Sequence, residues 1–394
     1  MTLGILTFHS SINEGAILQA YCLTEHLKST LSSTAVEIID HRYPTKTAVY
    51  ENPDDIRTQT LTEFIEHQLP ISSERFFEAD HVPAFEYVRQ HCCGLVVGSD
   101  QVWKLKYRKR LRGLLSEQTS PMHPPFPNVY WPDESIRMPK IAYAVSVGQT
   151  DWIKIPGSHR KKMRRILADF SLLGLRDRRT KLFLEWLDPA IAERSEWVPD
   201  PTFSIDISGL VDRENLKNKL EQYGVDFSRP RVGVVMRDSP ATEVSVNRFR
   251  EKGYQVIGLT ERNRVSDVNL FERGFSPLEW SAIFGLADVW IVERMHACIF
   301  SILNNTPFVA VDFRRNPLND ESKIRDLLRS FDLMDSYYNV HLDPADRLQG
   351  ICDRLMDHEW PSAEVTGKTA HFRQRSQDFG EKIKAIVQGW KPGS

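Results

Sequence analysis

Short apolar runs alternate with helix-sized intervals along most of this chain, and that alternation limits the folds it can adopt. Strand-like runs occupy residues 3–8, 36–40, 94–97, 141–147 and 172–175. Apolar residues at helical spacing separate them, most clearly over residues 14–28, where Ile17, Leu18, Tyr21 and Cys22 recur. Strands alternating with helices predict a mainly parallel sheet with helices on its faces.

A second set of strand-like runs follows, at residues 231–236, 254–259, 289–292 and 308–311. The break between the sets falls near residues 204–212, after Val198-Pro199-Asp200-Pro201-Thr202, where two prolines hinder a continuous helix. We therefore expect an α/β protein with two Rossmann-like domains, 1–205 and 206–365. A C-terminal helix within 366–394 is expected to pack back on the first domain.

The composition narrows the class of protein. Of the 394 residues, 41% are apolar and the net charge is −2, so the chain can bury a core, and no global positive field indicates nucleic-acid binding. Five cysteines without CxxC spacing fit a reducing cytoplasm. No signal peptide or run of about 20 apolar residues is present. We expect a cytoplasmic protein, and peripheral contact with membrane-bound glycan machinery at the inner face of the membrane is compatible with this.

Residues 104–137 do not follow the alternation. A basic cluster, Lys104 to Arg112, precedes five prolines between Pro121 and Pro132, with little periodicity. A segment of this length without regular structure is usually functional or mobile. We favour a solvated insertion, and the alternative is a lid or a platform for an anionic acceptor.

Glu293-Arg294-Met295-His296 lies between a buried strand and the start of a helix. Ligands of open α/β sheets bind at the carboxyl ends of strands, and a helix N-terminus favours anions. Arg237 follows the first strand of the second domain, so the two arginines are expected to meet at one sheet edge. Two guanidiniums suit a ligand with both a carboxylate and a phosphate, and a histidine can transfer a proton near neutral pH. The alternative is structural: Arg294 pairs with Glu293 or Asp312, and His296 caps its helix.

Polar residues also follow strands of the first domain. In Gly98-Ser99-Asp100-Gln101-Val102-Trp103, Ser99, Asp100 and Gln101 offer short polar groups, and Trp103 offers a ring that could stack on a sugar. The alternative is a β-turn with a core tryptophan. Asn13-Glu14-Gly15-Ala16 opens the first long helix, either as a ligand contact or as an ordinary cap. Arg176 ends another strand and could face a cleft between the domains.

Several common site motifs are absent. The chain has no GxGxxG after its first strand, no GxxxxGK[ST] and no GxSxG, so no dinucleotide, P-loop or hydrolase site is indicated. Its histidines are not at metal-ligand spacings. We expect neither a metal nor a bound cofactor.

Taken together, the motifs resemble the polysaccharide pyruvyl transferase family. The resemblance rests on an ordered set over residues 3–313: the opening strand with Asn13-Glu14-Gly15-Ala16, the segment Gly98–Trp103, residues 143–148, Leu175-Arg176-Asp177, residues 198–202, and Arg294-Met295-His296 with Thr306-Pro307-Phe308. An aromatic is common in the family where Glu14 stands. Residues 104–137 are not covered.

The resemblance implies a GT-B-like fold, with two Rossmann-like domains facing across a cleft. It also implies phosphoenolpyruvate as co-substrate and a sugar hydroxyl pair of a surface polysaccharide, or of its lipid-linked precursor, as acceptor. A pyruvate ketal forms and phosphate leaves. Arg294 and His296 take the family's Arg-x-His positions as catalytic residues, and Arg237 joins them in binding the donor. Asn13, Glu14, Ser99, Asp100, Gln101 and Trp103 form the expected acceptor side, with Asp100 or Glu14 as base. A nucleotide-sugar glycosyltransferase and a non-catalytic glycan-binding protein are the alternatives.

Overall fold

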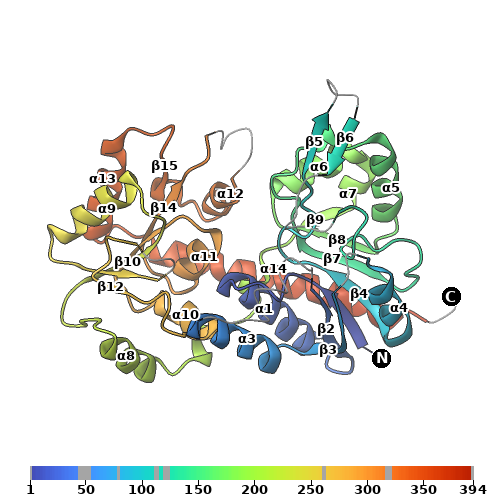
Figure 1. Ribbon diagram of the computed structural model, residues 1–394, viewed down its shortest axis with the longest axis horizontal. Helices are drawn as coiled ribbons and strands as arrows, with labels where there is room; N and C mark the ends of the chain where they lie inside the picture. Colours follow the sequence, from blue (N-terminus) through green and yellow to red (C-terminus); the bar gives the residue numbers. More distant parts are fainter. Residues whose placement is uncertain are drawn as a thin grey trace. The chain divides into compact units, whose positions relative to one another are not determined.

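The computed structural model describes residues 2–42, 55–77, 80–110, 115–118, 125–259, 263–315 and 322–391. The chain divides into two compact units. Unit 1 comprises Met1–Asp54, Thr62–Ile205 and Phe372–Ser394, and unit 2 comprises Asp55–Leu61 and Asp206–His371. Both are α/β layers built on a parallel sheet (Figure 1).

The sheet of unit 1 has seven strands, all paired in parallel. Their spatial order is β3 (Ile71–Phe76), β2 (Ala35–His41), β1 (Thr2–Leu6), β4 (Cys92–Val97), β7 (Lys140–Val145), β8 (Leu172–Leu175) and β9 (Ser195–Trp197). β4 and β7 are buried along their whole length, as expected for central parallel strands covered on both faces. Chain order reverses direction between β1 and β4, so this pair is the switch point of the sheet.

Helices of unit 1 connect these strands. They are α1 (Glu14–Thr30), most of α3 (Ile56–Gln68), α4 (Val82–His91), α5 (Gly157–Ala168), α6 (Arg178–Leu187) and α7 (Pro189–Glu193), with 3₁₀ turns η2 (Trp152–Lys154) and η3 (Pro201–Phe203). Asn13 caps α1 by accepting from Ala16 N at 3.0 Å, and Asp177 caps α6 through Thr180 N at 2.8 Å. Side-chain caps of this kind fix where each helix begins.

Unit 2 repeats the plan with six parallel strands. Their order is β12 (Val268–Asn269), β11 (Gln255–Gly258), β10 (Arg231–Val235), β13 (Val289–Val292), β14 (Phe308–Asp312) and β15 (Tyr337–Asn339). The switch point lies between β10 and β13. The helices and 3₁₀ turns are η4 (Ser208–Leu210), α8 (Arg213–Gln222), α9 (Pro240–Arg250), α10 (Pro277–Ile283), α11 (Met295–Leu303), α12 (Lys323–Ser330), η5 (Met334–Ser336) and α13 (Ala345–Met356).

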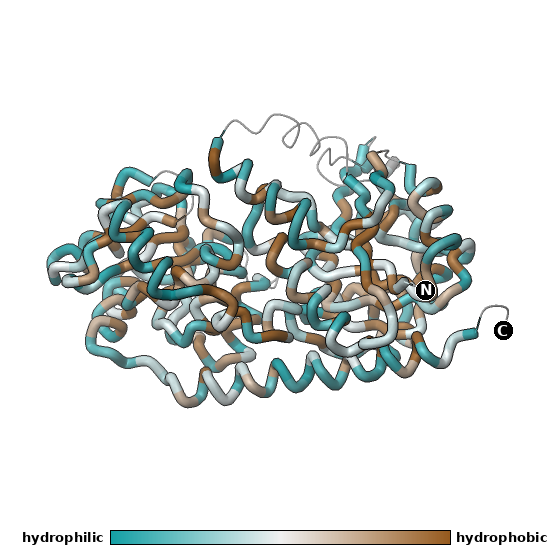
Figure 2. The backbone as a smooth tube through the Cα atoms, turned by 90° about the horizontal axis from the view of Figure 1, so that it is seen from below, coloured by the Kyte–Doolittle hydropathy of each residue, from teal (hydrophilic) through white to brown (hydrophobic). Residues whose placement is uncertain are grey.

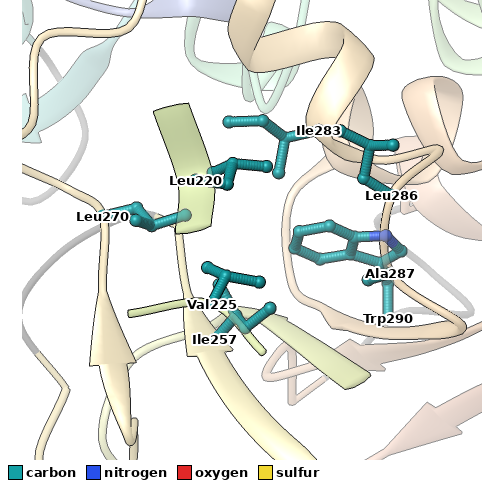
Figure 3. Close-up of a pocket in the computed structure, with 8 residues that line it drawn as sticks. All are labelled: Leu220, Val225, Ile257, Leu270, Ile283, Leu286, Ala287 and Trp290. Carbon is teal, nitrogen blue, oxygen red and sulfur yellow. The ribbon is translucent and has the colours of Figure 1, made fainter. Parts of the chain in front are cut away.

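The two faces of the unit 2 sheet are packed differently. On one face, apolar side chains of α9 and α13 cover β10, β13 and β14. On the other, the fully buried Trp290 ring lies against Gly233 of the neighbouring strand and donates its N–H to Phe284 O at 2.9 Å. The ring also borders a small apolar cavity with Leu220, Val225, Ile257, Leu270, Ile283, Leu286 and Ala287 (Figure 3).

The last helix, α14 (Ser362–Gly389), belongs to unit 2 as far as His371 and to unit 1 from Phe372 onward. Hydrophobic positions recur among hydrophilic ones along it (Figure 2). In its unit 1 part, Phe379 packs edge-on against Tyr143 of β7 and over Gly174 of β8. The helix thus completes the core of unit 1 from a distant part of the sequence.

The segment 104–137 departs from the solvated insertion that we favoured. β5 (Tyr107–Arg110) and β6 (Leu115–Gln118) form an antiparallel hairpin. Further along, Phe126 and Trp131 are buried, and Trp131 stacks on Trp103 with ring centroids 5.1 Å apart. Pro132 is buried in this packed part and Pro125 is exposed, while Arg112, Pro121 and Pro124 lie outside the described residues.

None of the described helices combines the length and apolar character needed to cross a bilayer. The five cysteines are buried and free of disulfides. Over the described ranges, no group of three or more His, Cys, Asp or Glu side chains is arranged to hold a metal ion.

Candidate active site

The switch point of unit 2 carries the arginines and the histidine singled out in the sequence. Val235 ends β10 and is in register with Val292, which ends β13. Arg237 lies two residues after Val235, and Arg294 lies two residues after Val292. The two arginines therefore follow neighbouring strands at the same level of the sheet edge. The crevice at a switch point is where open α/β sheets bind ligands.

Helix α11 begins directly after Arg294. Arg294 is the N-cap residue, with φ −116° and ψ 139°, and its side chain does not cap the helix. His296 is in the first turn, partly exposed, with its ring over Phe300 at a centroid distance of 6.5 Å. Backbone N–H groups at a helix start attract anions, so an anion here would meet Arg294, His296 and the helix terminus together.

Arg237 is held by two contacts from the adjoining strand ends. Its Nε donates to Glu293 Oε2 at 2.8 Å, and its guanidinium lies 4.9 Å from the centroid of the Phe313 ring. The Arg237 side chain is 60% exposed while that of Glu293 is only 7% exposed. A buried carboxylate and a ring therefore fix one end of a guanidinium that faces solvent.

The two acids considered as partners of Arg294 also contact other residues. Glu293 pairs with Arg237, and Asp312 accepts from Tyr337 Oη at 2.9 Å and from Arg314 N at 3.0 Å. Phe313 was not identified from the sequence as part of this edge, and Glu293 was considered only as a partner of Arg294. The strand register contains the signal, because the residues that follow Val235, Val292 and Ala310 align across β10, β13 and β14.

At the switch point of unit 1, the residues after β1 and β4 are tied together by a buried glutamine that sequence reasoning missed. Gln19 of α1 donates to Thr7 Oγ1 at 2.9 Å and to Phe8 O at 3.2 Å, and it accepts from Ser99 Oγ. Gln19 and Ser99 are fully buried. Ser99 therefore ties this strand junction together through its hydroxyl, and the acceptor contact expected of it stays a prediction.

Trp103 is likewise a core residue. Its ring is fully buried, stacks on Trp131 and donates its N–H to Tyr130 O at 3.0 Å. A ring covered on this scale presents no face to a sugar, so the alternative weighed for it, a turn followed by a core tryptophan, is what the structure adopts. Glu14 is also buried.

Asn13, Asp100 and Gln101 are the expected acceptor residues that retain partial exposure. Asp100 has a positive φ of 72° and accepts from Arg176 Nη2 at 2.9 Å. Arg176 also donates to Asp200 at 2.9 Å and is buried. Burial alone would lower the pKa of Arg176, but the carboxylates of Asp100 and Asp200 raise it, so the guanidinium stays charged and holds Asp100 in place.

A sequence model of polysaccharide pyruvyl transferases matches residues 13–314, about three quarters of the chain. The chain belongs to the polysaccharide pyruvyl transferase family. The match includes the switch point of unit 2, and Asp100, Arg237, Arg294 and His296 lie inside it. Comparison with curated protein sequences gives no significant match.

Solved structures similar to this family member have GT-B folds. An Anabaena HepE protein in complex with UDP aligns with a TM-score of 0.56 at 11% identity, covering 99% of this chain and 100% of its own. UDP-GlcNAc 2-epimerase from Methanocaldococcus jannaschii aligns with a TM-score of 0.56 at 12% identity, covering 99% of this chain and 100% of its own. A glycosyltransferase from Rickettsia africae aligns with a TM-score of 0.55 at 11% identity, covering 100% of this chain and 99% of its own. At these identities the likeness shows the fold, which is GT-B as expected.

Proposed function

We propose that this family member transfers the pyruvyl group of phosphoenolpyruvate to two hydroxyls of a sugar, forming a ketal and releasing phosphate. The observation that supports it best is the clustering of two arginines and a histidine at the switch point of unit 2. Phosphoenolpyruvate carries a carboxylate and a phosphate, and guanidiniums bind each such group through paired hydrogen bonds. No bound cofactor is needed in this scheme.

The reaction requires an acid at the donor. His296, protonated, gives a proton to the methylene carbon, which becomes the methyl group, and the central carbon becomes electrophilic. One sugar oxygen bonds to that carbon, and a second displaces the phosphate. A base on the acceptor side takes the proton of the first hydroxyl, and the proton of the second hydroxyl leaves with phosphate. Proton exchange with solvent then returns the base and His296 to their starting states. A well-placed acid contributes roughly 10² to 10⁴ in rate.

We assign the acceptor side to unit 1, at Asn13, Asp100 and Gln101. Asp100 is the proposed base for the first hydroxyl because its carboxylate is partly exposed and fixed by Arg176. Glu14, the other base considered, is buried in α1 and is the weaker choice. The acceptor would be a polysaccharide or its precursor, in keeping with the family.

The direct test is phosphate release from phosphoenolpyruvate over a panel of pyruvylatable glycans. We expect acceptor-dependent release with the wild type, and loss of at least a hundredfold in kcat for His296→Ala with unchanged circular dichroism. Arg237→Gln should mainly raise KM for phosphoenolpyruvate, and Arg237→Lys should recover part of that loss. Undiminished turnover of His296→Ala would remove His296 from the mechanism.

A nucleotide-sugar transferase is the rival, because the Anabaena HepE structure of the same fold contains UDP. A thermal-shift comparison separates the two proposals. Stabilisation by phosphoenolpyruvate that is lost in Arg294→Ala supports the pyruvyl donor. Stabilisation by UDP-sugars alone would support the rival. If neither ligand stabilises the protein and no glycan leads to phosphate release, a non-catalytic glycan binder is favoured.

A further inference from the structure

Positive charge is concentrated in two segments of unit 1. Residues 104–118 and residues 151–165 each contain six Lys or Arg and one acidic residue, whereas the whole chain has a net charge of −2. Within the first segment, residues 107–110 and 115–118 form the β5–β6 hairpin, which Figure 1 shows standing at one end of the unit. The second contains η2 and α5. Neither is used by the proposed reaction.

The two segments form one surface because they contact each other. Tyr107 of β5 is buried, and its hydroxyl lies 2.9 Å from His159 Nδ1 of α5. Leu105 N donates to Thr150 Oγ1 at 2.8 Å, just before η2, and η2 itself contacts β5. We call the exposed side of β5–β6, η2 and α5 the basic surface.

Several of its charges are balanced locally and others are not. Arg108 and Arg110 share Glu117, and Arg164 pairs with Asp188. Arg165 pairs with Glu134 and Lys154 with Asp151, both exposed. Three further lysines are exposed and, within the described part of the chain, form no ion pair: Lys106, Lys109 and Lys161.

An exposed apolar side chain lies among the charged residues of the basic surface. Ile153 of η2 is 73% exposed, the highest value among the large hydrophobic residues of the described chain. Its neighbour Trp152 is partly exposed, with the Arg179 guanidinium 4.6 Å from its ring centroid. An isoleucine side chain is less favourable in water than among lipid acyl chains. Tryptophan prefers the interface between the water and the acyl chains.

We propose that the basic surface docks unit 1 on an anionic lipid bilayer, with the lysines against acidic headgroups and Ile153 inserted below them. A soluble polyanion would complement the charges but would give no favourable environment to Ile153, which is why the bilayer is the chosen partner. Docking of this kind is peripheral and depends on ionic strength. It is independent of the reaction proposed for Arg237, Arg294 and His296.

The test is co-sedimentation of the full chain with vesicles of phosphatidylglycerol and phosphatidylcholine, against phosphatidylcholine alone. We expect binding to the anionic vesicles that falls with added salt. A Lys106→Gln, Lys109→Gln, Lys161→Gln variant should bind roughly a hundredfold more weakly, at about fivefold per charge removed. Ile153→Ser should lose about tenfold, because most of an isoleucine's transfer free energy disappears.

Matched controls remove the same groups elsewhere. A Lys217→Gln, Lys252→Gln, Lys384→Gln variant removes three charges outside the basic surface, and Leu342→Ser removes another exposed hydrophobic side chain, 54% exposed in unit 2. Both should bind like the wild type. Circular dichroism and thermal midpoints establish that every variant is folded.

Three results would overturn the proposal. The first is equal binding of the lysine variant and the wild type, and the second is no preference of the wild type for anionic vesicles. The third is full binding by Ile153→Ser with loss in the lysine variant, because Ile153 would then give no reason to prefer a bilayer to a soluble polyanion. Loss of vesicle binding with normal phosphate release would leave the proposed reaction untouched.

Discussion

Gly233 is the residue whose replacement tests most directly how unit 2 is packed beneath its switch point. A Cβ atom there would lie 2.2 Å from Cε3 and Cζ3 of Trp290. Ordinary contact begins at 3.4 Å, so the ring must retreat by about 1.2 Å. That movement also strains the hydrogen bond from the ring N–H to Phe284 O.

The expected cost of Gly233→Ala follows from these two effects. Overpacking a close-packed core costs about 1–3 kcal/mol, and a lost hydrogen bond adds about 1 kcal/mol. The small cavity that borders Trp290 gives the ring some room to move, so the cost should stay within this range (Figure 3). We expect a decrease of about 2–4 kcal/mol in the free energy of unfolding of unit 2.

Urea unfolding followed by circular dichroism measures this change. With a slope of about 2 kcal/mol per molar urea for a unit of this size, the midpoint of the unit 2 transition should fall by about 1–2 M. Gly350→Ala is the matched control, because Gly350 lies within α13 and a Cβ there meets nothing within 4 Å. Alanine favours a helix over glycine, so this control should gain about 0.5–1 kcal/mol.

The reasoning fails if Gly233→Ala unfolds at the wild-type midpoint, or if both substitutions change stability in the same direction. A Gly233→Ala variant with normal stability would mean that β10 and β13 can separate without cost. In that case their register would be a poor guide to how Arg237 and Arg294 are positioned.

Three further predictions concern buried charges and the donor arginine. Burial lowers the pKa of His26 from 6.5 to about 4, so its stabilising contribution is present above pH 6.5 and is lost as the pH falls. By pH 5 the free energy of unfolding of the wild type should fall by about 2 kcal/mol more than that of His26→Gln. Equal losses for the two proteins in a urea titration would contradict this. Asp200→Asn leaves the buried Arg176 hydrogen-bonded to one carboxylate, that of Asp100, and should destabilise unit 1 by about 3 kcal/mol in the same assay, whereas an unchanged midpoint would show that the Asp100 contact suffices. Glu293→Gln should raise KM for phosphoenolpyruvate several-fold with little change in kcat, because it loosens Arg237, and a fall in kcat alone would assign Glu293 to the chemistry.

The strands and the edge of unit 2 were predictable because they depend on local patterns. Apolar runs mark β10 and β13, and parallel pairing places the residues that follow them, Arg237 and Arg294, at one edge. The acceptor side was less predictable. The local pattern around Ser99 and Trp103 does not show that Ser99 contacts Gln19, which lies 80 positions earlier in the sequence. It also does not show that Trp131 covers Trp103. Such contacts arise from tertiary packing, which a single sequence does not report.

The division of α14 between the units has a consequence for how the protein is made. During synthesis, all seven strands of the unit 1 sheet have been translated once β9 ends at Trp197, but Phe379, which packs against β7 and β8, is translated some 180 residues later. Unit 2 has the opportunity to fold in that interval, since domains generally fold as units. Until then, the sheet of unit 1 lacks the part of α14 that covers β7 and β8. A ribosome-bound chain stopped before α14 should therefore depend on chaperones more than the finished protein does. For the same reason, a chimera that exchanges unit 1 between relatives must exchange the end of α14 as well.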